Sequence, residues 1–107
     1  MKTLHLVPTS YEILYEAMLL NSEGYKGAEL RVANKILDKF ERAGTLKDGE
    51  DGERGIYTLL EDAGREISLE DTEFELLKKA FNSVQWSGRS LRKVAKVYEL
   101  LENPSAG

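Results

Sequence analysis

The sequence predicts a single α+β domain, in which a small antiparallel sheet packs on about four helices. Its 107 residues suit one domain, expected over residues 1–103 with a frayed tail over 104–107. Apolar residues make up 41% and charged residues 32%, which is typical of a small folded protein and too apolar for a disordered one. Apolar residues recur at helical spacing in four segments, while β-branched and aromatic residues gather in shorter ones.

The first elements expected are a strand and a helix. Thr3–Val7 has the composition of a strand, and Pro8 ends it because proline has no N–H for a strand ladder. Thr9, with Glu12 three residues later, matches a capping box that would open a helix. The polar residues 21–24 would end that helix. Its apolar side is expected to consist of Tyr11, Ile13, Leu14, Ala17 and Met18.

A second helix is expected from about Gly27 to Ala43. Its apolar face would be formed by Leu30, Ala33, Ile36, Leu37 and Phe40. Gly44 stands where a left-handed residue commonly ends a helix. The polar, glycine-rich residues 45–55 predict a loop.

The segment after this loop supports two interpretations. Residues 56–60 and 67–69 have strand composition and would form a hairpin that joins the N-terminal strand in the sheet. Ile56, Leu59 and Ala63 also match helical spacing. The hairpin is preferred because a short helix ending in acidic residues would oppose its own dipole.

Two further helices are expected to close the chain as an αα-hairpin. Asp71 would cap the third helix, and a turn over 82–88 around Trp86 would lead to a fourth helix from about Ser87 to Glu102. The apolar face of the third helix would be Phe74, Leu77, Phe81 and Val84. That of the fourth would be Leu91, Val94, Ala95, Tyr98 and Leu101.

The net charge of −4 conceals two segments of opposite sign. Residues 48–75 carry eleven acids and two bases, a net charge of −9. Residues 76–98 carry six bases and no acid, a net charge of +6. The acidic segment begins with Asp48, Glu50, Asp51 and Glu53.

Four of the bases, Arg89, Arg92, Lys93 and Lys96, fall within one sector of about 100° on the fourth helix. Three of them lie in its first half, where the helix dipole disfavours cations. Either they form a solvated face balanced by the protein's own acidic segment, or they form a contact surface for an acidic partner. With opposite charges on two surfaces, head-to-tail self-association is a further hypothesis.

The same helices suggest a competing interpretation. A helix, a short turn and a second helix with basic residues at its start outline a helix-turn-helix reader of nucleic acid. Against it, the chain has a calculated pI of about 5.1, whereas duplex-binding domains usually carry a net positive charge. Trp86 would be either a core residue or part of a protein contact, in which tryptophan is enriched.

The sequence contains few of the residues and motifs that build catalytic or metal sites. Cysteine is absent and His5 is the single histidine, which excludes thiolate and multi-histidine sites. The 48–53 loop does not match a calcium-binding EF-hand, because placing Gly52 at the conserved glycine puts Lys47 at the first ligand position. We therefore expect no catalytic residue, no metal and no cofactor.

No apolar stretch approaches the ~18–20 residues that span a bilayer, and the N-terminus has no apolar core of signal-peptide length. A cytoplasmic protein without a membrane partner is expected.

The segment Ile67–Phe81, followed by a tryptophan and a closing helix, resembles small acidic proteins encoded by tailed phages and prophages. The N-terminal strand, Pro8 and the helix after it are similar to that class as well. The resemblance implies a non-enzymatic accessory role in the host cytoplasm, through contact with a host or phage protein.

Together these observations predict a protein-binding module. Its partner-binding residues would be Arg89, Arg92, Lys93, Lys96 and Trp86, together with the acidic segment. The alternative is a helix-turn-helix transcriptional regulator.

Overall fold

The computed structural model describes residues 1–21, 23–47, 56–59, 63–103 and 105–106 and confirms the α+β class. The helices are α1 (Pro8–Leu19), α2 (Ala28–Ala43), α3 (Asp71–Ser83) and α4 (Leu91–Glu102), with a 3₁₀ turn at Gly88–Ser90 before α4. The strands are β1 (Lys2–Leu6), β2 (Thr45–Lys47), β3 (Ile56–Thr58), β4 (Arg65–Leu69) and β5 (Ser105–Ala106). None of the described helices has the length and apolar character that a membrane crossing requires.

The described strands form two antiparallel sheets, one of three strands and one of two, rather than one continuous sheet. β1 lies between β4 and β5, with Leu4 opposite Ile67. β3 is a strand, as expected, but the expected hairpin with residues 67–69 is wrong: β3 pairs with β2, and β4 pairs with β1. The ring of Tyr57 on β3 contacts that of Tyr15 on α1, with centroids 5.7 Å apart, so the β2–β3 ribbon is anchored on α1. Residues 105–106, expected in a frayed tail, pair with β1 as β5.

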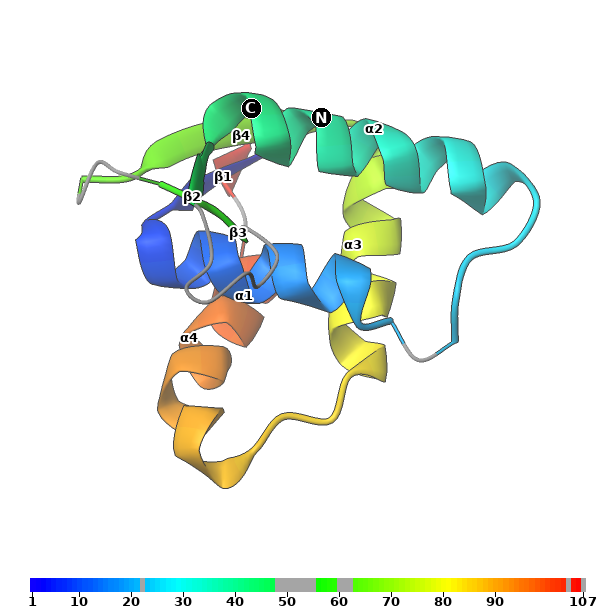
Figure 1. Cartoon of the computed structure of the whole chain (residues 1–107). Coiled ribbons are helices and arrows are strands. Elements are labelled where there is room, and N and C mark those ends of the chain that lie inside the picture. Colours follow the sequence, from blue (N-terminus) through cyan, green and yellow to red (C-terminus); the bar gives the residue numbers. More distant parts are fainter. Residues whose placement is uncertain (22, 48–55, 60–62, 104, 107) are drawn as a thin grey trace.

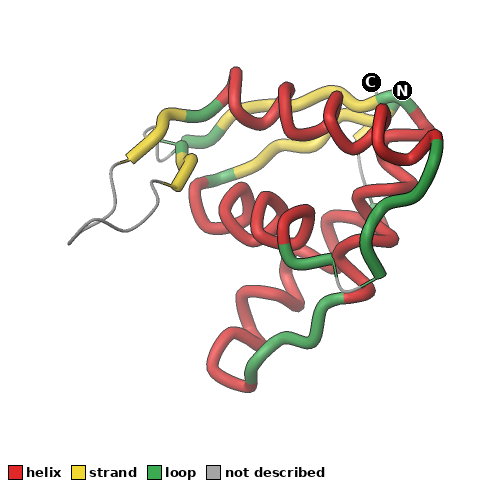
Figure 2. The backbone as a smooth tube through the Cα atoms, turned by 45° about the vertical axis from the view of Figure 1, so that its right-hand side comes forward, coloured by secondary structure: helices red, strands yellow, loops and turns green. Residues whose placement is uncertain are grey.

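Helix α1 occupies the middle of the molecule. In Figures 1 and 2 it lies between α2 with the strands on one side and α4 on the other, and it also contacts α3. Its residues face several neighbours at once, which explains why half of the helix is buried. The largest fully buried side chains are Tyr11, Phe40, Leu4, Leu6, Leu14, Ile36, Leu69, Leu77, Leu101 and Val97.

Two of the expected helix caps are wrong by one or two residues. Val7, not Thr9, precedes α1, and its N–H donates to Ser10 Oγ at 3.0 Å. Pro8 fits the first helical position because its missing N–H would have no partner there. Glu70, not Asp71, precedes α3, and its N–H donates to Glu73 Oε1 at 2.8 Å.

Gly44 follows α2 as expected but is not left-handed, since its φ is −100°. Its role is steric: a Cβ at this position would lie 2.2 Å from the Tyr11 hydroxyl oxygen. That hydroxyl donates to the Phe40 carbonyl at the last turn of α2. The sequence signal marked the correct residue for a different reason.

The apolar faces of two helices also need correction. Leu30 on α2 is 55% exposed, and on α4 Leu91 and Tyr98 are 63% and 49% exposed. Ala95 is exposed as well. The buried residues of α4 are Val94, Val97 and Leu101, because this is the side that α4 turns to the core.

The two C-terminal helices follow each other across residues 84–87, as expected. α3 runs toward this connection and α4 returns from it (Figure 1), and each packs on α1. Lys78 on α3 and Glu102 on α4 form an ion pair of 3.4 Å.

Candidate functional site

The four bases predicted as a contact surface are exposed on α4 and on the 3₁₀ turn before it. Within the described part of the chain, none of Arg89, Arg92, Lys93 and Lys96 forms an ion pair or a side-chain hydrogen bond. The two bases of α3 differ: Lys78 pairs with Glu102, and Lys79 pairs with Glu29 at 3.1 Å. Both bases of α3 therefore have internal partners, whereas the four bases predicted as a contact surface have none among the described residues.

The actual orientation of α4 places part of this surface beside α1. Because Val94, Val97 and Leu101 face inward, Lys93 lies at the edge of the buried stripe, and Lys96 lies further round the helix on the same side. Both side chains line concave surface between α4 and the start of α1. The basic face is thus connected to a cleft, which the sequence did not predict.

The first part of this cleft, here called the aromatic pocket, has a volume of about 270 Å³. Three aromatic rings from separate elements line it: Tyr15 on α1, Tyr57 on β3 and Trp86 before α4. The remaining lining residues are Thr9, Glu12, Ile13, Glu16, Ser90 and Lys93. Two of the predicted contact residues, Trp86 and Lys93, therefore come together here.

The second part adjoins the first through Thr9 and Lys93, which line both. It has a volume of about 430 Å³, and its other lining residues are Val7, Ser10, Lys96, Val97 and Leu100. We call the two parts together the α1–α4 cleft. It combines apolar walls with the two lysines of α4.

Trp86 is half-buried and packs on Phe81 of α3, with ring centroids 5.7 Å apart and planes inclined by 36°. Its Nε1 is buried and has no acceptor among the described residues. Trp86 thus contributes to the core through one part of its ring and lines the aromatic pocket with another. The expected core role is therefore confirmed in part, and the role in a protein contact stays a prediction.

Tyr15 is held in place by a hydrogen bond from its hydroxyl to Glu41 Oε2 at 3.2 Å. Burial and the neighbouring Glu41 carboxylate raise the pKa of Tyr15 to about 12. This phenol is therefore neutral at physiological pH and contributes an uncharged ring to the pocket.

The carboxylates of Glu12 and Glu16, one turn apart on α1, have no ion pair or hydrogen-bond partner in the described structure. Among the described residues, no three metal-ligating side chains come close enough to hold a metal ion. His5 lies elsewhere, on β1, where its Nε2–H donates to the Ala63 carbonyl at 2.8 Å.

The acidic segment predicted as a second contact region, Asp48, Glu50, Asp51 and Glu53, lies outside the described residues.

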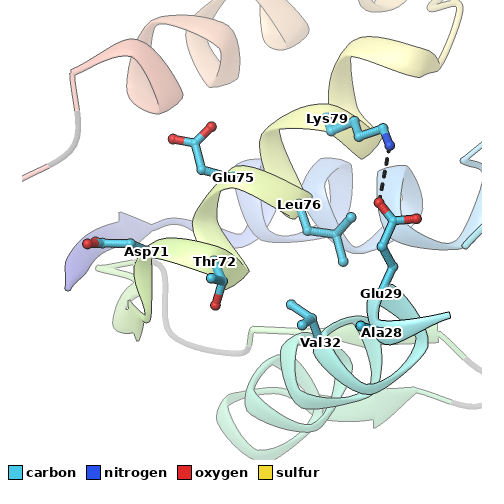
Figure 3. Close-up of a pocket in the computed structure, with 8 residues that line it drawn as sticks. All are labelled: Ala28, Glu29, Val32, Asp71, Thr72, Glu75, Leu76 and Lys79. Carbon is cyan, nitrogen blue, oxygen red and sulfur yellow. Dashed lines mark hydrogen bonds and ion pairs between the residues drawn. The ribbon is translucent and has the colours of Figure 1, made fainter. Parts of the chain in front are cut away.

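A second concavity of about 440 Å³ lies between α2 and α3. Figure 3 shows Val32 and Leu76 pointing toward each other across it, with the Lys79–Glu29 ion pair at one end. None of the predicted contact residues lines this groove. Its Glu29–Lys79 charges neutralise each other, which distinguishes it from the α1–α4 cleft.

One polar contact was missed from the sequence. Lys39 Nζ on α2 lies 2.5 Å from Oε1 of Glu73 on α3, and Glu73 is only 3% exposed. Burial raises the pKa of Glu73, but the hydrogen bonds from Lys39 and from the Glu70 N–H lower it by more than burial raises it. The net pKa therefore lies below its usual value. The pair ties α2 to the start of α3.

Comparisons with protein-family models, with curated protein sequences and with solved structures find no match to this chain.

Proposed function

We propose that this chain is a small, non-enzymatic protein-binding module that docks an acidic segment of a partner on the basic face of α4. The observation that carries the proposal is the absence of internal partners for Arg89, Arg92, Lys93 and Lys96 within the described structure. Three of these cations occupy positions that the helix dipole disfavours. A partner's carboxylates would relieve this unfavourable arrangement and would also speed association.

The α1–α4 cleft supports the proposal because it adds apolar surface beside the cations. Val97, Leu100 and the half-buried Trp86 line it next to Lys93 and Lys96. Stable protein contacts combine an apolar centre with a polar rim, and tryptophan is enriched among their strongest residues. The resemblance to phage and prophage proteins suggests a host or phage protein as the partner.

A defined acidic peptide tests the proposal. We expect a 16-residue peptide rich in Glu and Leu to shift the amide NMR signals of α4 in the ¹⁵N-labelled protein. The double variant Arg89→Glu, Lys93→Glu should weaken binding about ten-fold or more, since each exposed charge pair contributes up to about 1 kcal/mol and reversal makes it repulsive. The matched control is Arg31→Glu, Lys35→Glu, which makes the same charge change on the exposed side of α2 and should have little effect.

Two outcomes would overturn the proposal. One is equal weakening by the α2 control, which would mean that only net charge matters. The other is tighter binding of a 16-base-pair DNA duplex, with a log–log salt slope of about 0.9 per phosphate neutralised. That result would favour the helix-turn-helix alternative.

A further inference from the structure

We infer that the aromatic pocket binds a single organic cation, such as a methylated ammonium or a guanidinium group. The inference goes beyond the proposed function, because this ligand carries the opposite charge to the segment proposed for the basic face. It depends on the pocket's walls, its free carboxylates and its size.

The walls are the rings of Tyr15, Tyr57 and Trp86, which come from three separate elements and meet at one cavity. The faces of aromatic rings carry partial negative charge and attract cations within about 6 Å, tryptophan most strongly. Tyr15 and Tyr57 are tilted by 57° to each other, so they form two walls rather than one flat stack. Tyrosine and tryptophan rings are also the side chains that form the aromatic cages of quaternary ammonium sites.

The charges at the pocket also favour a cation. Glu12 and Glu16 line it from consecutive turns of α1. Neither carboxylate is engaged by another described residue. Lys93 is the one cation in the lining, so the three charged side chains sum to −1. A cation bound against the rings would be attracted by the carboxylates of Glu12 and Glu16 and repelled by the ammonium group of Lys93.

The size of the pocket fits a side-chain head group rather than a whole ligand. Sites that enclose small molecules usually measure about 300–1,000 Å³, whereas this pocket has about 270 Å³. Inorganic cations would lose hydration without gaining a cage of oxygen ligands, which calcium and magnesium require. An alkylated ammonium or a guanidinium group is weakly hydrated and can use the aromatic faces.

Trp86 makes the inference directly measurable, because it is the single tryptophan of the chain and lines the pocket. The probes are acetyl-trimethyllysine amide, acetyl-arginine amide and a neutral analogue with a tert-butyl group in place of trimethylammonium. We expect a saturable change in Trp86 fluorescence with a cationic probe. The neutral analogue should bind at least about five-fold more weakly. Comparison of the two cations identifies which head group the pocket prefers.

Variants assign the effect to the pocket. The double variant Glu12→Gln, Glu16→Gln should bind the preferred cation about five- to ten-fold more weakly. Tyr57→Leu should bind it about three-fold more weakly. The matched control, Asp38→Asn, Glu99→Gln, makes the same charge change at exposed positions elsewhere and should leave affinity unchanged. Circular dichroism checks that each variant is folded.

Lys93→Gln separates this inference from the proposed function. Removal of the repulsive ammonium should tighten cation binding about two- to five-fold, while the acidic peptide should bind more weakly. Equal binding of the tert-butyl analogue, or no saturable binding of either cation, would overturn the inference and leave the acidic-peptide proposal standing. If the cation binds as expected but the Arg89→Glu, Lys93→Glu variant and the α2 control bind the acidic peptide equally, the acidic-peptide proposal falls and the cation inference stands.

Discussion

The α2–α3 side and the α1–α4 side of this domain differ in whether charged side chains form ion pairs within the described structure. On the α2–α3 side, two lysines form ion pairs between helices: Lys39 binds the buried Glu73, and Lys79 binds Glu29. On the α1–α4 side, neither the α4 cations nor Glu12 and Glu16 have a partner among the described residues. Lys39 and Lys79 thus stabilise the packing of α2 on α3, whereas the α4 cations remain available for contact with a partner. The difference lies in pairing, not in the number of charges.

The largest expected effect is on the paired side. Glu73→Ala should lower the free energy of unfolding by about 2–4 kcal/mol, because it removes two hydrogen bonds and leaves Lys39 without its partner. In a domain of this size the melting temperature should fall by roughly 10 °C. Urea unfolding measures the change. Glu75→Ala, on an exposed position of the same helix, is the control and should stay within about 0.5 kcal/mol.

The inward face of α4 gives the next largest effect. Val97→Ala should destabilise the domain by about 1–3 kcal/mol, because Val97 is 1% exposed in the core. Leu91→Ala should change the unfolding free energy by less than about 0.5 kcal/mol, although Leu91 is the larger side chain. Denaturant midpoints of the two variants decide this, and the reverse order would show that α4 is rotated from its described position.

The paired side should also respond to acid. The pKa of Glu73 is lower in the folded state than its ordinary value of 4.5, so this carboxylate contributes stability that is present above pH 4.5. That contribution is lost as the pH falls through the folded-state pKa. Between about pH 5 and about pH 3, the wild type should therefore lose more stability than Glu73→Gln. Parallel slopes in urea titrations across this range would contradict the assignment.

The smallest effect on stability is expected on the unpaired side. Arg89→Glu, Lys93→Glu should leave the unfolding free energy within about 0.5 kcal/mol, or raise it slightly, because acids suit the first turns of a helix better than bases do. Thermal unfolding at low and moderate salt measures this. A marked loss of stability would mean that these cations support the fold, and the comparison between the two sides would fail.

The sequence was informative where a helix buries one continuous face. Ala33, Ile36 and Phe40 on α2 were correctly assigned to the core, because α2 is amphipathic with one buried face. On β1, the exposed His5 alternates with the buried Leu4 and Leu6, as strand geometry requires. The four α4 cations were identified because no acid interrupts their segment.

It was less informative where several elements meet. β3 pairs with β2 rather than β4 and places Tyr57 against Tyr15 of α1, a contact between distant segments that no local pattern encodes. The aromatic pocket joins Tyr15, Tyr57 and Trp86 across 71 residues of chain, so spacing alone could not reveal it. Glu73 was one of nineteen acids, and its burial depends on the packing of α2 against α3.

The pairing of Lys2 and Thr3 with Ala106 and Ser105 brings the two described ends of the chain together. In Figure 1 both ends lie near α2, on the opposite side of the molecule from the connection between α3 and α4. A tether or fusion at either end would therefore leave the α1–α4 cleft facing outward. Adjacent ends also make circular permutation practicable, because a short linker could join them.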